Sequence, residues 1–182
     1  MIRRLSLAAS LLALAGCVTP SEQLPLPPDA AHGAGYVDPA DVERIVLDAA
    51  RERYGDNLVS QSVRSSDYII VWRAYGGIPV PPPPGEPFPP PPAPRMALLA
   101  MKGGLWVFAE NGIWRQARPG MIAEIEAIAA TQNFWQEPVH VPPCPDYGAM
   151  RMVAKFSGKP KIARDHACPS QSDRLAHYAL EA

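Results

Sequence analysis

Four side chains in the last third of the chain could do chemistry: the cysteines Cys144 and Cys168 and the histidines His140 and His166. Two thiolates and two imidazoles would suit Zn²⁺, but the spacings His140-x₃-Cys144 and His166-x-Cys168 differ from those of common zinc modules. In an oxidising compartment two cysteines favour a disulfide instead. They flank an expected hairpin whose turn brings its ends together, so we predict that Cys144 and Cys168 are bonded to each other.

The same neighbourhood allows an alternative, in which His140, Asp146 and His166 act as acid and base groups of an enzyme. Asp165 directly precedes His166, but neighbouring strand residues point to opposite faces of a sheet, so Asp165 does not orient His166. The sequence has no GxSxG, HExxH or glycine-rich phosphate-binding motif. His177 is interpreted as a surface or capping residue of the last helix. We therefore predict no catalytic residue, no bound metal and no cofactor, and keep the enzyme as an alternative.

A proline-rich stretch in the middle of the chain could bind a partner. Residues 79–94, PVPPPPGEPFPPPPAP, contain 11 prolines in 16 positions. Proline runs adopt the stiff polyproline II helix, which aromatic-lined grooves recognise. The alternative is a solvent-exposed spacer, because lengthening a loop costs little entropy. The candidate partner-binding residues are Phe88, Pro82, Pro83, Pro90 and Pro91.

The tryptophans could also form a platform on which a ligand stacks. Three of them lie on expected strands beside β-branched residues, so packing in the core is the favoured interpretation. The four are Trp72, Trp106, Trp114 and Trp135.

Helices and strands must position all of these residues. Asp38 is a predicted N-cap, Pro39 starts a helix that Gly55 ends, and a second helix starts at Pro119. A last helix is capped by Ser170 or Ser172 and ends near residue 180. Strands are expected over residues 57–64, 68–75, 95–102, 105–109, 113–117, 149–156 and 160–167.

These elements predict the α+β class. Tight turns such as Asn111-Gly112 join consecutive strands, which indicates antiparallel pairing. We expect one domain over residues 38–182, with an antiparallel meander sheet and helices on one face. It would carry a disulfide-tied C-terminal hairpin and the proline-rich insertion loop over residues 79–94.

The N-terminus has the pattern of an export signal. Arg3 and Arg4 precede an apolar run, Leu5–Ala15, of eleven residues interrupted only by two serines. A membrane-spanning helix takes about 20 apolar residues, so this run is too short to cross the bilayer. Residues 1–16 are therefore predicted to be a signal peptide.

The run ends in Leu14-Ala15-Gly16-Cys17, which resembles the lipobox of bacterial lipoproteins. The resemblance implies cleavage before Cys17, lipids on its thiol and new amine, and stable attachment to a membrane. Val18 replaces the aspartate that retains such proteins in the inner membrane, which implies the periplasmic face of the outer membrane. Residues 17–37 are rich in proline, alanine and glycine and would form a tether with a reach of about 25 Å.

Composition limits the remaining function classes. Without Arg3 and Arg4 the chain has 15 basic and 18 acidic residues, a net charge of −3, which does not indicate a nucleic-acid partner. A modest basic patch is interpreted as the solvated face of the C-terminal hairpin. Its members are Lys155, Lys159, Lys161 and Arg164.

The leading hypothesis is a lipid-anchored cell-envelope lipoprotein with a non-enzymatic accessory or protein-binding domain. Its expected contacts are the membrane, through the anchor, and another envelope protein. A small inhibitor of an envelope hydrolase is an alternative, as is the enzyme that uses the neighbourhood of His140, Asp146 and His166.

Overall fold

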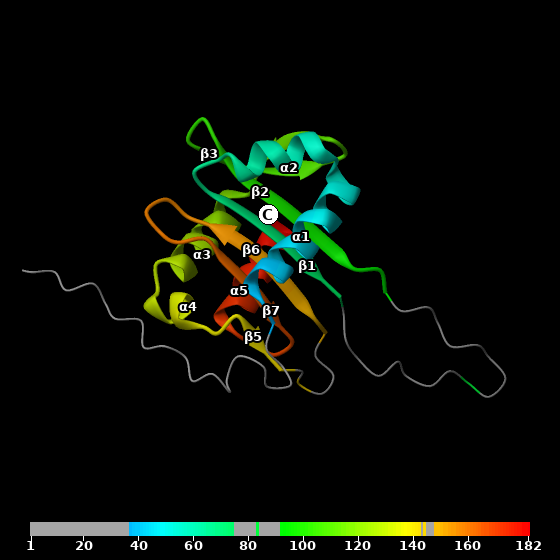
Figure 1. The fold of residues 1–182 in the computed structure, drawn as a ribbon. Coiled ribbons are helices and arrows are strands. Elements are labelled where there is room, and N and C mark those ends of the chain that lie inside the picture. Colours follow the sequence, from blue (N-terminus) through cyan, green and yellow to red (C-terminus); the bar gives the residue numbers. More distant parts are fainter. Residues whose placement is uncertain (1–36, 75–82, 84–91, 143, 145–147) are drawn as a thin grey trace, which may run out of the picture.

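The computed structural model describes residues 37–74, 83, 92–142, 144 and 148–182 (Figure 1). The residues that resemble a lipobox and nearly all of the predicted tether lie outside this range, as does Asp146. Of the five candidate binding residues in the insertion only Pro83 is described, and it is exposed. The predictions that concern Phe88, Pro82, Pro90 and Pro91 therefore lie outside the described residues.

The described residues form one seven-stranded sheet with the strand order β4-β3-β2-β1-β6-β7-β5. The strands pair antiparallel except for β5 and β7, which are parallel, so the sheet is mixed. The α+β class is confirmed, but the order is not that of a simple meander because β6 returns to pair with β1. The strands are β1 Tyr68–Arg73, β2 Arg95–Lys102, β3 Leu105–Glu110, β4 Ile113–Gln116, β5 His140–Val141, β6 Met150–Lys155 and β7 Ile162–His166.

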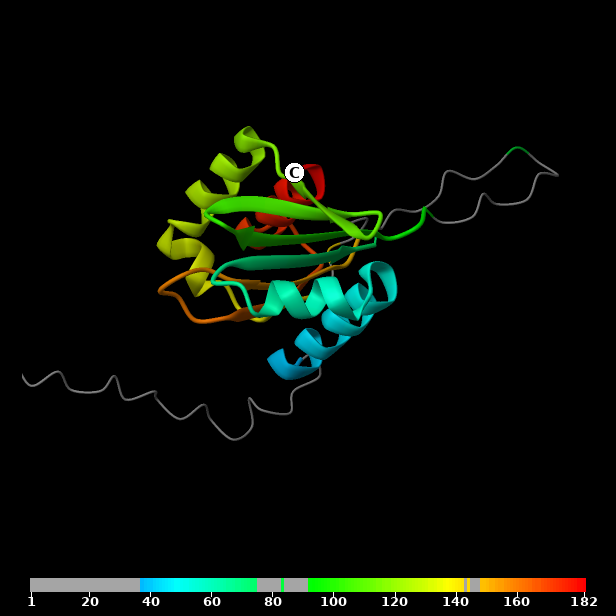
Figure 2. The same ribbon diagram turned by 90° about the horizontal axis from the view of Figure 1, so that it is seen from above.

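Helices cover both faces of the sheet, so the prediction that they lie on one face is wrong (Figure 2). The reason is visible in β1, where Ile69 and Val71 pack toward one helical layer and Tyr68 and Ile70 toward the other. A central strand that is apolar on both sides needs a cover on each. Helices α1 Pro39–Tyr54 and α2 Asp56–Val63 form one layer; α3 Pro119–Ala129, α4 Gln132–Gln136 and α5 Gln171–Glu181 form the other.

The strand expected over residues 57–64 is instead helix α2. Its buried residues are Leu58, Val59 and Ser62. Positions i, i+1 and i+4 lie on one side of a helix. Gly55, at φ +84°, separates α1 from α2 and lets the chain change direction. The short α4 and the two-residue β5 were not expected from the sequence.

Two of the tryptophans belong to an aromatic cluster under α3 and α4. Trp106 is buried and lies 6.2 Å from Phe156 between ring centroids, and Trp135 meets both Phe134 and Phe156 edge to face. These contacts agree with the expected role in core packing.

The other two tryptophans are half-buried on the α1 and α2 face, each with a cation over its ring. The guanidinium of Arg151 lies 5.4 Å from the ring centroid of Trp72, and the ammonium of Lys102 lies 4.6 Å from that of Trp114. The indole N–H of Trp114 donates to Gln61 of α2 at 3.0 Å. Intramolecular partners thus occupy part of both rings.

Candidate functional site

The predicted disulfide between Cys144 and Cys168 is confirmed. Their Cα atoms lie 5.2 Å apart, within the usual range for a disulfide. The backbone N–H of Cys144 also donates to the carbonyl of Ala167 at 3.0 Å, which holds the two segments together. Both thiols are consumed by this bond, so the zinc alternative loses two of its four ligands.

His166 is buried, and both of its ring nitrogens are occupied. Nε2 lies 2.8 Å from the carbonyl oxygen of Pro138, which can only accept, so this nitrogen carries the proton. Nδ1 lies 2.9 Å from the hydroxyl oxygen of Ser170 and accepts a hydrogen bond from it. Burial lowers the pKa of His166, so the neutral ring that this arrangement needs is favoured.

A serine hydroxyl donating to a histidine is also the arrangement of an activated nucleophile. Here, however, the Ser170 oxygen accepts from the N–H of Asp173 at 3.0 Å and caps α5. The carboxylate of Glu137 accepts from the N–H groups of Gln171 and Ser172, which are the donors that would stabilise an oxyanion. Glu137, His166 and Ser170 therefore form a helix cap in which the donors and acceptors already have partners within the chain.

His140 lies on the other face of the sheet from His166. Its Nδ1 is 3.9 Å from a carboxylate oxygen of Asp165, whose other oxygen is 3.5 Å from the Nε of Arg151. As expected, Asp165 and His166 point to opposite faces, because they are neighbours on β7. The two histidines therefore cannot act on one substrate, and this geometry does not favour the enzyme alternative.

One member of the expected basic patch is not solvated. Arg164 is 5% exposed, and its guanidinium lies 3.5 Å from the carbonyl oxygen of Trp135 and close to Glu137. Burial lowers its pKa, and the charge of Glu137 opposes that effect. Lys159 and Lys161 are exposed, and Lys161 forms an ion pair with Glu43 of α1. Only some of the four basic side chains are therefore exposed to solvent.

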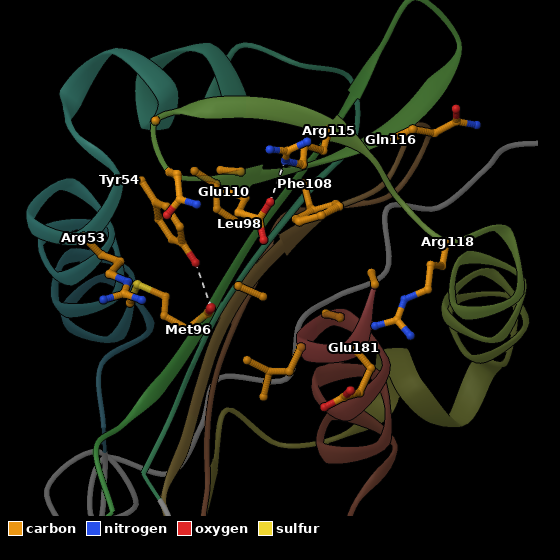
Figure 3. A pocket seen from close by; sticks show the side chains of 17 residues that line it. Arg53, Tyr54, Met96, Leu98, Phe108, Glu110, Arg115, Gln116, Arg118 and Glu181 are labelled. Carbon is orange, nitrogen blue, oxygen red and sulfur yellow. Dashed lines mark hydrogen bonds and ion pairs between the residues drawn. The ribbon is translucent and has the colours of Figure 1, made fainter.

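A larger feature lies on the opposite side of the sheet: a cleft of about 920 Å³ between β2 and the hairpin of β3 and β4 (Figure 3). Strand β3 pairs with β2 only between Leu99 and Lys102. Beyond Leu99, β3 separates from β2 and continues to the two-residue turn Asn111-Gly112, which leads into β4. Residues 95–98 of β2 are consequently paired with β1 alone.

The separated strands leave backbone groups of β2 facing the cleft. The N–H of Met101 donates to Asp67 on the side of β1, and backbone direction alternates along a strand. Met96 and Leu98 therefore direct their N–H and C=O groups away from β1. Leu98 is fully buried, so only the half-buried Met96 presents backbone groups to the cleft. The carbonyl of Met96 accepts the hydroxyl of Tyr54 at 2.7 Å. The N–H of Met96 is thus the backbone donor of β2 that a peptide in the cleft could reach.

The ends of two helices from opposite layers form the walls of the cleft. Tyr54, at the end of α1, is half-buried, and burial raises the pKa of its hydroxyl. The end of α5 contributes Ala179 to Ala182, and Phe108 adds an aromatic ring from β3. The cleft thus combines a polar backbone edge with apolar side chains, which suits an extended peptide.

Five charged side chains also line the cleft. They are Arg53, Arg115, Arg118, Glu110 and Glu181. Glu110 is paired with Arg115 at 2.5 Å, and Glu181 with Arg95 at 2.7 Å. The hydrogen bond from Arg95 lowers the pKa of Glu181, so this carboxyl is ionised at neutral pH.

None of the residues in the cleft was a candidate from the sequence. The local signal was the Asn111-Gly112 turn, which fixes the hairpin. It does not show that β3 leaves β2 after four pairs.

Comparison with protein-family models, curated proteins and solved structures found no match to this chain. Within the part that the structure describes, no helix is long and apolar enough to cross a membrane. The same residues contain no group of three histidine, cysteine or acidic side chains that could hold a metal ion.

Proposed function

We propose that this chain is a lipid-anchored cell-envelope lipoprotein whose domain binds another envelope protein by holding an extended segment of it in the cleft. The observation that carries this proposal is the end of β2 at Met96, where β3 no longer pairs with β2 and the half-buried backbone faces the cleft. An extended peptide can add a strand to such an edge, with backbone hydrogen bonds giving affinity and side-chain pockets giving specificity.

The position of the edge supports this use. Most open strand edges lie at the outside of a sheet, where charge, proline or a covering loop protects them from aggregation. This one lies between two strands of the same sheet and is flanked by the ends of α1 and α5. Because helix ends flank it, this position is less accessible to another sheet than an outer edge would be.

The lipobox resemblance supports the location in the proposal. Lipids on Cys17 would anchor the domain, and the tether over residues 17–37 would let it reach partners about 25 Å from the periplasmic face of the outer membrane. The disulfide between Cys144 and Cys168 agrees with an oxidising compartment. No cofactor is needed for this function.

The binding part of the proposal is tested by removing one backbone donor from the edge. Met96→Pro deletes the N–H that faces the cleft, while the hydrogen bonds between β2 and β1 remain, since proline is tolerated where an edge N–H is not paired. A photoreactive residue at the exposed Gln116, which lines the cleft, reports what enters it in cells.

We expect the Gln116 probe to form a discrete cross-linked product that decreases about tenfold with Met96→Pro, because proline removes a hydrogen bond and crowds the strand that would pair there. Met96→Leu is the matched control, since it keeps both the N–H and the apolar volume. Equal cross-linking in the two variants would show that the edge is not the binding element.

The anchoring part is tested by Cys17→Ala. Without the thiol no lipid can be attached, so we expect the protein in the soluble periplasmic fraction or uncut at the inner membrane. Fractionation with the outer membrane, as for the unchanged protein, would refute the lipobox interpretation.

A further inference from the structure

Resting on the proposed function, we infer that the segment held in the cleft is acidic, with carboxylates on both sides of the part that pairs with β2. Three arginines from three different elements line this one cleft: Arg53 from α1, Arg115 from β4, and Arg118, the residue that precedes α3. All three are exposed, so a ligand in the cleft can reach their guanidinium groups.

The charges of the cleft do not cancel. Glu110 and Glu181 are its two acidic residues, and each already has an arginine partner, Arg115 and Arg95. With Arg53 and Arg118 the side chains count four arginines against two glutamates, and the carboxylate of Ala182 beside Arg118 lowers the excess to +1. This excess contrasts with the predicted mature chain, whose net charge is −3.

The two additional arginines lie on opposite walls. In Figure 3 Arg53 stands on the side of α1 and Arg118 on the side of α3 and α5, with Met96 and Leu98 between them. A strand that pairs with this edge would run between the two guanidinium groups. Carboxylates that flank the paired residues would therefore meet an arginine on each side.

Arginine favours carboxylates for a geometric reason. Its planar guanidinium can donate two parallel hydrogen bonds to the two oxygens of one carboxylate. A lysine-rich segment would instead place like charges beside Arg53 and Arg118. A lipid or polysaccharide could supply the negative charge but has no backbone to pair with β2, so the edge selects for a peptide.

The inference is tested by panning the purified full chain against a displayed library of random octapeptides. We expect the captured sequences to contain more aspartate and glutamate than lysine and arginine. The best sequence is then made as a synthetic peptide, with a second version in which each acidic residue is replaced by its amide, and binding is measured by fluorescence anisotropy.

We expect the dissociation constant to increase about two- to fivefold for each exposed charge pair that is lost, and about tenfold for the double variant Arg53→Gln/Arg118→Gln. The amide version of the peptide should show the same loss. Arg44→Gln is the matched control, because Arg44 is exposed on α1 but pairs with Asp41 and does not line the cleft. Higher salt should weaken binding of the acidic peptide.

The other outcomes separate this inference from the proposed function. Neutral or basic peptides that lose binding with Met96→Pro but not with Arg53→Gln/Arg118→Gln would overturn the inference and leave the proposed function in place. Failure to capture any peptide, or peptides insensitive to Met96→Pro, would overturn both. Binding of vesicles of phosphatidylglycerol that depends on Arg53 and Arg118, without peptide binding, would also overturn both.

Discussion

The two halves of the sheet differ in how their polar groups are paired. We call the half around β7, α4 and α5 the closed half, and the half around β2, β3 and β4 the open half. Where β7 meets α4 and α5, the side chains of Glu137, His166 and Ser170 are bonded to neighbouring backbone groups, and the disulfide closes the same region. Across the sheet, β3 leaves β2 after four pairs, and the half-buried backbone of Met96 faces a cleft. Residues with the most reactive side chains therefore support the structure, while ordinary strand residues form the candidate site.

Glu137 shows most clearly why the first half is not a binding site. The N-terminus of a helix attracts anions because its first N–H groups have no partner within the helix. In α5 the carboxylate of Glu137 already accepts from Gln171 and from both the N–H and the hydroxyl of Ser172. A ligand would have to displace a charge that the chain itself supplies.

The largest expected effect concerns the disulfide, which should stabilise the closed half. Cys144 and Cys168 are 24 residues apart, and closing a loop of that length contributes about 3.5 kcal/mol in the chain-entropy model. Cys144→Ala/Cys168→Ala should lower the free energy of unfolding by about that amount, as measured by urea denaturation. Reduction of the unchanged protein is the matched comparison. A loss below about 1 kcal/mol would show that the hydrogen bonds around β5 and β7 suffice to hold this half closed.

The second largest effect is expected at Glu137. Glu137→Ala leaves two N–H groups of α5 without a partner and removes the charge beside the buried Arg164, which should cost about 2–3 kcal/mol. Glu124→Ala, at an exposed position on α3, is the control and should change the stability by less than about 0.5 kcal/mol. Equal stabilities for the two variants, measured by thermal or urea unfolding, would mean that water replaces the carboxylate and that the helix end is accessible to a ligand.

Local signals in the sequence predicted much of the closed half. The cysteine pair, the hairpin of β6 and β7 and the Ser170 cap each depend on residues close together in the chain or on a compartment that the N-terminus indicates. Arg164 was assigned to a solvated face because the exposed Lys159 and Lys161 shortly precede it in the sequence. The carboxylate and carbonyl that accompany it come from Glu137 and Trp135, about 30 residues earlier.

The open half could not be predicted in the same way. Residues 57–64 contain β-branched and polar residues in an order that also fits a strand, and only packing against the sheet selects the helix α2. The apolar pattern of Tyr68–Arg73 indicated a central strand but not that two layers of helices would cover it. The cleft depends on where four separate segments meet, a feature that no local pattern contains.

The smallest effect on stability is expected from the proline-rich insertion, which joins two strands of the open half. Arg73 and Arg95 are directly opposite each other in the register of β1 and β2, so a short turn can connect them. Replacing residues 80–93 with Gly-Asn should therefore change the free energy of unfolding by less than about 1 kcal/mol, as expected for shortening a loop.

The control that separates folding from binding is the Gln116 probe carried in the same variant. Unchanged cross-linking would leave the cleft as the binding element and the insertion as a spacer. Loss of cross-linking in a folded variant would show that Phe88 or the flanking prolines contribute to binding, and a large loss of stability would show that the insertion packs against the domain.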